Sequence, residues 1–251
     1  MKILAIDTSG QQAGAAIVDE YITIGEISLN ARSGEKSWHH SEILMPGIDQ
    51  LFNLTGMRMQ DIDYIAYTAG PGSFTGLRIG ASTAIGLAKG LGIPAVGVPT
   101  LDALAYNVLY TGTGGYVIPM MDARRGQVYA AIYEQSSIHG LSRTTDYMAL
   151  PVEEVVKQID LSPVFFLGDG ADAYHNVIMA SLEGTTRFRD VYGSTPEVVF
   201  LSQNLNRQRA SSVGVWLFEQ IRHGFKPEEN DGKVDILYIR DPQAVRSLKK
   251  S

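Results

Sequence analysis

The 251-residue sequence has no cysteine, little charge and no long hydrophobic run. The absence of cysteine excludes disulfides, thiolate metal sites and cysteine nucleophiles, so any metal site must use histidine and carboxylate ligands. No apolar run approaches the roughly 20 residues that a membrane-spanning helix needs. Charged residues make up only 19% of the chain, but the 45% hydrophobic content is ordinary for a globular protein and excludes intrinsic disorder.

The balance of charge is acidic, with 21 Lys and Arg against 27 Asp and Glu and a net charge of −6. This balance argues against autonomous nucleic-acid binding through a basic face, although it leaves a local basic patch open. The apolar run from Ile3 to Ile6 ends at Asp7 and is shorter than the roughly 7 to 15 residues of a signal peptide. We therefore expect a buried strand at the N-terminus, no membrane association and a cytoplasmic protein.

The hydrophobic pattern predicts an order of elements that occurs twice. In the first half we expect strands at 3–6, 13–18, 22–29, 63–69 and 95–98, with helices at 38–54, 74–91 and 101–109. Pro46 predicts a kink or restart inside the first of these helices. In the second half we expect strands at 116–121, 127–133 and 164–167, with helices at 151–159, 173–182 and 207–223.

Two internal offsets support a duplication. An offset of 115 residues pairs Asp7 with Asp122, and an offset of 98 pairs Gly70 and Gly72 with Gly168 and Gly170. A β-β-β-α-β-α order that occurs twice predicts an α/β protein with the two-lobed actin-like ATPase fold, which is RNase H-like in each lobe. We expect an N-terminal lobe over 1–104, onto which the helix at 207–223 packs back, a smaller second lobe over 105–206, and a C-terminal arm over 226–251.

The turns that follow the strands are the candidate phosphate site. Asp7 stands at the end of the first strand, where an actin-like kinase places an acid that orients a magnesium-bound water. The segment from Gly70 to Arg78 joins a strand to a helix and lacks the GK[ST] ending of a P-loop. Taken alone, Asp7 is better explained by an Asx-turn, and the glycine segment by a tight strand-to-helix turn without a ligand. The candidate phosphate or nucleotide residues are Asp7, Thr8, Ser9, Gly70, Gly72, Ser73 and Asp122.

Metal and hydrolase chemistry have little support. None of the five histidines, His39, His40, His139, His175 and His223, forms an i, i+4 pair, so no metal site is expected. The chain contains no GxSxG motif, and no positioned histidine accompanies Ser73.

Three segments resemble a known family. The segments ILAIDTS at 3–9, HSEILMPGI at 40–48 and AGPGSFTGLRIGASTAIGLAKGLGIPAVGVPTLDALA at 69–105 are similar to the bacterial TsaB (YeaZ) family. MDARRGQVYAAIY at 121–133 and YIRDPQAV at 238–245 extend the resemblance more weakly. The family implies an actin-like double lobe and a role in forming threonylcarbamoyladenosine at position 37 of tRNAs that read ANN codons.

The resemblance also implies partners. Members of the family are held to be non-catalytic paralogues that pair with the catalytic TsaD, are joined by the ATPase TsaE, and form a competing homodimer. Contact with tRNA would be indirect, through the complex. The resemblance implies no cofactor of the chain's own, with ATP or ADP bound weakly or at the partner interface. TsaD carries an HxxxH metal pair where this chain has Thr100 and Leu104, and a hydroxyl and an isobutyl group cannot replace two imidazoles.

The family resemblance places the partner interface on the helices at 38–54 and 74–91. The expected interface residues are His39, His40, Ile43, Leu44, Arg78, Ser82 and Ile85. For Ile43, Leu44 and Ile85, packing inside the protein is an equal alternative. Alternative functions are a nucleotide-binding ATPase or kinase-like protein, a partner-binding protein of another pathway and, less favoured, a peptidase of the glycoprotease (M22) type, for which the chain provides no activated nucleophile or metal.

Overall fold

The computed structural model divides into two compact units. Unit 1 comprises residues 1–106 and 208–237, and unit 2 comprises residues 107–207 and 238–251. The structure describes residues 1–30, 32–33, 36–37, 39–109, 114–136, 140–159, 163–182, 197–227, 236–237 and 239. Most of the expected C-terminal arm at 226–251, and Trp38, lie outside the described residues.

Unit 1 is built on a five-stranded sheet with the order β3-β2-β1-β6-β7. Its strands are β1 (Ile3–Asp7), β2 (Gln12–Val18), β3 (Thr23–Asn30), β6 (Tyr64–Gly70) and β7 (Ala95–Pro99). β1 pairs antiparallel with β2 and parallel with β6, and β6 pairs parallel with β7. Two-residue strands β4 (Arg32–Ser33) and β5 (Lys36–Ser37) pair with each other.

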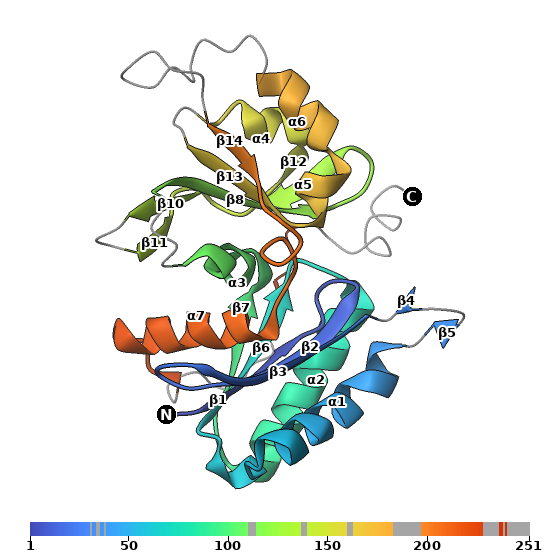
Figure 1. Ribbon diagram of the computed structural model, residues 1–251, viewed down its shortest axis with the longest axis vertical. Coiled ribbons are helices and arrows are strands. Elements are labelled where there is room, and N and C mark those ends of the chain that lie inside the picture. Colours follow the sequence, from blue (N-terminus) through green and yellow to red (C-terminus); the bar gives the residue numbers. More distant parts are fainter. Residues whose placement is uncertain are drawn as a thin grey trace, which may run out of the picture. The chain divides into compact units, whose positions relative to one another are not determined.

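Helices cover both faces of this sheet (Figure 1). The helices α1 (His40–Thr55) and α2 (Phe74–Leu91) pack on one face, against a core that includes Leu4 and Ile6. The helices α3 (Thr100–Ala105) and α7 (Ala210–Arg222) pack on the other, against Ile3 and Ala5. Because successive side chains of a strand point to opposite faces, the apolar residues 3–6 of β1 contribute to both cores. Short 3-10 helices follow at Met59–Asp61 and Tyr106–Val108.

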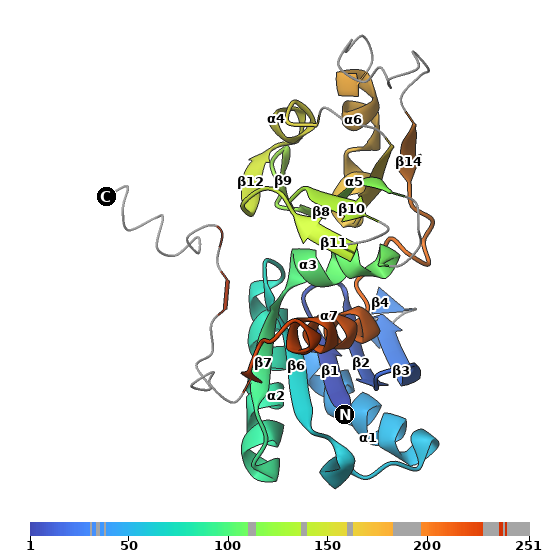
Figure 2. The same cartoon turned by 90° about the vertical axis from the view of Figure 1, so that its left-hand side faces the viewer.

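The helix α7 joins unit 1 from far along the chain. It lies beside β1 and β2, and Figure 2 shows it across the sheet from α2. Close packing needs a glycine here, because a Cβ at Gly214 would overlap Val18. The close approach of α7 to the sheet is therefore built into its sequence.

Unit 2 repeats the strand order of unit 1. Its sheet has the path β11-β10-β8-β13-β14, with β9 paired to β8 and to β12. The strands are β8 (Gly115–Asp122), β9 (Gln127–Ala130), β10 (Tyr133–Ser136), β11 (Gly140–Arg143), β12 (Met148–Pro151), β13 (Val164–Leu167) and β14 (Val198–Phe200). β8 runs antiparallel to β10 and parallel to β13, as β1 does to β2 and β6.

One face of the unit 2 sheet is covered by short helices. These are α4 (Val152–Val156), α5 (Asp169–Ala173) and α6 (His175–Leu182). They pack on a core of buried side chains that includes Ile118, Val128 and Phe166. The mixed α/β actin-like fold expected from the sequence is therefore present, with an RNase H-like strand order in each unit.

Several predicted element boundaries were wrong. The strand predicted at 127–133 is broken into β9 and β10. The helix predicted at 173–182 begins at His175 as α6, and a separate short helix, α5, precedes it. The helix predicted at 151–159 stops at Val156, and the one at 207–223 begins only at Ala210. α1 continues without interruption through Pro46, so the expected restart does not occur. The sequence analysis did not predict β11, β12 and β14. Among the described residues, no helix is long and apolar enough to cross a membrane.

Candidate functional site

Asp7 holds together the turn that follows β1. Its Oδ1 accepts hydrogen bonds from the Ser9 amide (2.9 Å), the Ser9 hydroxyl (2.7 Å) and, more weakly, the Thr68 hydroxyl (3.3 Å). This is the geometry of an Asx-turn, in which a short acidic side chain bonds to the backbone two residues on. Thr68 belongs to β6, so the same carboxyl also connects two neighbouring strands.

The Asp7 side chain is buried, and its second oxygen has no partner. Desolvation by burial raises the pKa of Asp7, while hydrogen bonds from Ser9 and Thr68 oppose the rise. Oδ2 is one of four buried polar atoms without a hydrogen bond among the described residues; the others are His40 Nε2, Thr100 Oγ1 and Gln208 Nε2. All four belong to unit 1.

Thr8 connects this turn to α2. Its hydroxyl donates a hydrogen bond of 2.8 Å to the carbonyl of Gly76. A Cβ at Gly76 would overlap the Thr8 backbone, and a Cβ at Gly80 would overlap the Thr8 side chain. The two glycines one turn apart therefore allow α2 to lie directly on the end of β1.

The turn after β6 closes on the same place. The Ser73 amide donates to the Ser9 carbonyl at 2.8 Å, and the Ser73 hydroxyl caps α2 by accepting from the Gly76 amide at 3.2 Å. A Cβ at Gly72 would overlap Ser9. The candidate residues Asp7, Thr8, Ser9, Gly70, Gly72 and Ser73 are thus brought together at one sheet edge, whereas Asp122 belongs to unit 2.

This edge does not fit the magnesium nucleotide that an actin-like fold implies. The amides of Thr8, Ser9 and Ser73 donate within the protein and are not directed at a ligand. The arrangement favours a structural role for the two turns. Nucleotide binding at a partner interface stays a prediction.

The solvent face of α2 carries a shallow groove. Its volume is about 500 Å³, and it is lined by Phe74, Thr75, Arg78, Ile79, Ser82 and Thr83. The Arg78 guanidinium lies 3.8 Å from the centre of the Phe74 ring, and no ion pair of Arg78 is found within the described residues. One turn further on, an added Cβ at Gly86 or Gly90 would meet open space. The solvent face of α2 therefore has an exposed cation beside the groove near its N-terminus and lacks side chains at Gly86 and Gly90.

The other expected interface residues divide between surface and core. His39 is exposed at the N-terminus of α1, where its backbone amide donates to Glu42 at 2.8 Å. His40, Ile43 and Ile85 are half-buried. Leu44 is 3% exposed and packs in the core under α1, so the alternative of internal packing applies to it. Arg78 and Ser82 are exposed and line the groove.

In unit 2, Asp122 is engaged by its own turn. Its carboxylate accepts from the Arg124 amide (2.8 Å) and the Tyr174 hydroxyl (3.0 Å), and forms an ion pair with the Arg124 guanidinium (3.2 Å). Burial raises the pKa of the neighbouring Asp169. A hydrogen bond from the Asp122 amide opposes this rise, and the negative charge of Asp122 adds to it.

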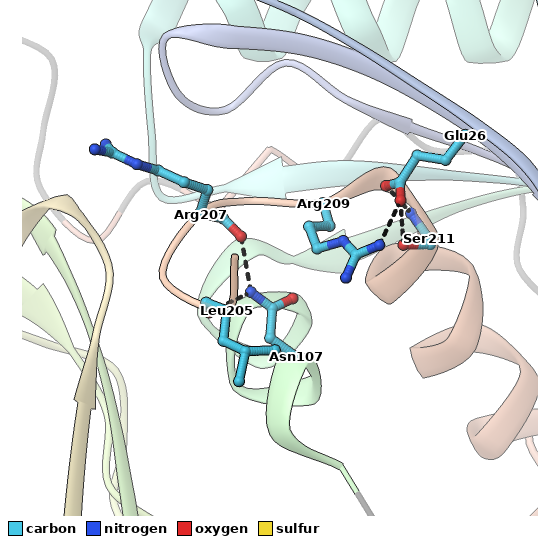
Figure 3. A network of polar contacts seen from close by, with 6 residues as sticks. All are labelled: Glu26, Asn107, Leu205, Arg207, Arg209 and Ser211. Carbon is cyan, nitrogen blue, oxygen red and sulfur yellow. Dashed lines mark hydrogen bonds and ion pairs between the residues drawn. The ribbon is translucent and has the colours of Figure 1, made fainter. Parts of the chain in front are cut away.

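Polar groups that the sequence analysis missed hold the chain near residue 208 (Figure 3). In unit 1, the Glu26 carboxylate accepts from the Ser211 amide (3.0 Å), the Ser211 hydroxyl (2.9 Å) and Arg209 (2.8 Å), at the N-terminus of α7. In unit 2, the Asn107 side chain donates to the carbonyls of Leu205 and Arg207. No sequence signal identifies these partners, because they lie about 100 or more residues apart.

Comparisons with known proteins agree on one family. A family model described as TsaD, tRNA N6-adenosine threonylcarbamoyltransferase, matches residues 34–213. The tRNA threonylcarbamoyladenosine biosynthesis protein TsaB of Bacillus subtilis is 35% identical over 190 residues, which cover 75% of this chain and 79% of that protein. TsaB of Escherichia coli is 32% identical over 158 residues, covering 63% and 65%. The solved structure of YeaZ from Pseudomonas aeruginosa has a TM-score of 0.71 at 23% identity, covering 95% and 99%.

Proposed function

The chain belongs to the TsaB (YeaZ) family of tRNA threonylcarbamoyladenosine biosynthesis proteins, and we propose that it is a non-catalytic subunit that pairs with TsaD. In this role it would support the transfer of a threonylcarbamoyl group to adenosine 37 of ANN-decoding tRNAs. TsaE would join the pair, and contact with tRNA would be made within the complex.

The observation that carries the proposal is the solvent face of α2. Small residues on a helix surface allow another helix to approach closely, and Ser82, Gly86 and Gly90 follow one another at intervals of four. The groove beside them adds the apolar surface of Phe74 and Ile79 and the charge of Arg78. On the adjoining α1, Met45 is 44% exposed. Small residues, apolar surface and one charge together suit a helical partner better than a small ligand.

Two places in unit 1, in α3 and in the turn after β1, support the non-catalytic part of the proposal. Thr100 and Leu104, where TsaD carries its histidine pair, are both fully buried. The Oδ1 atom of Asp7 accepts its hydrogen bonds from Ser9 and Thr68, within the protein. Both places therefore contribute to the packing of unit 1.

Co-purification with TsaD of the same organism tests the pairing. We expect a one-to-one complex with the wild-type chain and its loss with Arg78→Glu or Ser82→Tyr, because one reverses the charge of the groove and the other fills it. Lys157→Glu is the charge-matched control, since Lys157 is exposed in unit 2 and its pair with Glu154 is solvent-screened. Circular dichroism and thermal melting establish that each variant is folded.

The functional arm of the test measures modified tRNA. TsaD, TsaE and threonylcarbamoyl-adenylate should modify tRNA faster with the wild-type chain than without it, and Arg78→Glu should reduce the gain. Complexes that form equally with Arg78→Glu and Ser82→Tyr would overturn the assignment to α2. The same face would also form the homodimer expected in isolation, so sizing of the chain alone should show a dimer that the two variants dissociate.

A further inference from the structure

The hairpin between β8 and β9 has an unusual backbone. Arg124 and Arg125 both adopt left-handed conformations, with φ of 65° and 59°, and Gly126 follows with φ of 73°. They are the two non-glycine residues with positive φ in the described part of the chain. Glycine adopts this conformation freely, whereas an L side chain crowds its own backbone there. Two successive arginines are therefore held where glycine would be the easier choice.

Neighbouring groups hold the turn in this form. Asp122 accepts from the Arg124 amide, and the Tyr174 hydroxyl both donates to Asp122 (3.0 Å) and accepts from the Gly126 amide (3.2 Å). The Ala123 amide donates to the Gln127 carbonyl at 3.0 Å, which closes the hairpin. Asp122 at the end of β8, Tyr174 between α5 and α6, and the hairpin bond itself thus hold the backbone that carries both arginines.

The two guanidinium groups are presented to solvent. The side chain of Arg124 is 84% exposed despite its pair with Asp122, and Arg125 is exposed with no ion-pair partner among the described residues. The carboxylate that forms an ion pair with this turn is that of Asp122, and its partner is Arg124. In a chain with a net charge of −6, this turn presents two exposed guanidinium groups, one of which is paired with Asp122.

We propose that the turn formed by Arg124 and Arg125 contacts the phosphodiester backbone of the RNA substrate. The inference rests on the proposed function, because that function brings an RNA to the complex. Two exposed guanidinium forks on a fixed backbone suit a polyanion whose charges repeat and remain solvated. A single carboxylate of a protein partner would gain little at such an exposed position. The RNA contact gives a reason for arginine at two positions where the backbone favours glycine.

The test measures the affinity of an unmodified ANN-decoding tRNA transcript for the full chain, alone and in complex with TsaD. Fluorescence anisotropy at several salt concentrations compares the wild type with Arg125→Ala, Arg125→Glu and the control Lys157→Glu. We expect Arg125→Ala to weaken binding by about three- to tenfold and Arg125→Glu to weaken it more. The salt dependence of log K should become shallower by about one for each arginine removed. Lys157→Glu should leave both quantities unchanged.

Unchanged affinity and salt slope in Arg125→Ala and Arg125→Glu would overturn the RNA contact, whether or not the complex with TsaD forms. Titration with polyglutamate provides the second probe. Loss of polyglutamate binding with tRNA binding retained would also overturn it and assign the turn to an acidic protein partner. Failure of the proposed function looks different: the wild-type chain would not bind TsaD or would not increase tRNA modification.

Discussion

The Thr8 hydroxyl donates a 2.8 Å hydrogen bond to the Gly76 carbonyl, and this contact ties the end of β1 to the first turn of α2. Ser9 and Ser73 add a second connection at 2.8 Å between the two strand-end turns. The residues first considered for phosphate binding therefore position the helix whose other face carries the groove. A substitution in these turns should therefore alter the position of α2 and the shape of the groove on its solvent face.

Replacing Gly80 by alanine should destabilise the protein. A Cβ there would overlap the Thr8 side chain, so we expect the free energy of unfolding to fall by about 1–3 kcal/mol despite alanine's better helix propensity. Gly86→Ala is the matched control on the same helix, because its Cβ meets open space, and it should stabilise by up to about 1 kcal/mol. Urea denaturation measures both. Equal effects of the two substitutions would contradict the packing of Thr8 on α2.

Replacing the titratable carboxyl group of Asp7 by an amide should change how the free energy of unfolding depends on pH. Burial raises the folded-state pKa of Asp7, so between its unfolded and folded pKa values the folded protein binds more protons than the unfolded chain. The free energy of unfolding contributed by this group therefore falls as pH rises through that window. Asp7→Asn lacks this fall, so its stability relative to the wild type should rise as the pH increases above the unfolded-state pKa of about 4. Parallel stability curves for the two proteins would show that the pKa is not raised.

Truncating Glu26 should weaken the attachment of α7 to β3. The carboxylate accepts from the Ser211 amide and hydroxyl near the N-terminus of the helix, where a negative charge is favoured, so Glu26→Ala should cost about 1–3 kcal/mol of unfolding free energy. Arg209→Ala removes only the exposed ion pair to the same carboxylate and should cost less than about 1 kcal/mol. Thermal and urea unfolding compare the two. A larger loss in Arg209→Ala would reverse this ranking and contradict the capping role of Glu26.

Comparing Arg125→Gly with Arg125→Ala should distinguish the effect of residue 125 on stability from its effect on RNA binding. Because the backbone there is left-handed, Arg125→Gly should be more stable than Arg125→Ala by about 1 kcal/mol. Both variants lack the guanidinium, so their affinities for tRNA should be equally reduced. Chemical denaturation gives the first quantity and anisotropy the second. If alanine proved as stable as glycine, residue 125 would not be held in the left-handed region.

Much of the fold could be predicted from local pattern. The apolar run at 3–6 and the small-residue helix at 74–91 appear where the sequence places them, because a fully buried strand and a continuous helical periodicity are local properties. Boundaries failed where tertiary contacts intervene. Tyr174 bonds to Asp122 and Gly126 at the junction of α5 and α6, and the strand predicted at 127–133 divides so that β9 and β10 pair with different neighbours.

The candidate site was predictable in part. Asp7 and the Gly70–Ser73 turn were recognised as strand ends, and parallel strands bring such ends to one edge. Which amides they engage was not predictable, because Ser9 and Ser73 are distant in the chain. Leu44 is buried in the core and Arg78 is exposed to solvent, and this difference likewise depends on how α1 and α2 lie on the sheet.

By itself, the sequence determined the order of elements, their duplication and the resemblance to one family, since these depend on residue identity and spacing along the chain. Only the tertiary structure decided that the strand-end turns bond to each other, that α2 presents a grooved face, and that Arg124 and Arg125 lie in left-handed conformations. Hydrogen bonds and steric overlaps act between atoms close in space, and Thr8 meets Gly76 and Glu26 meets Ser211 only after folding has brought distant segments together.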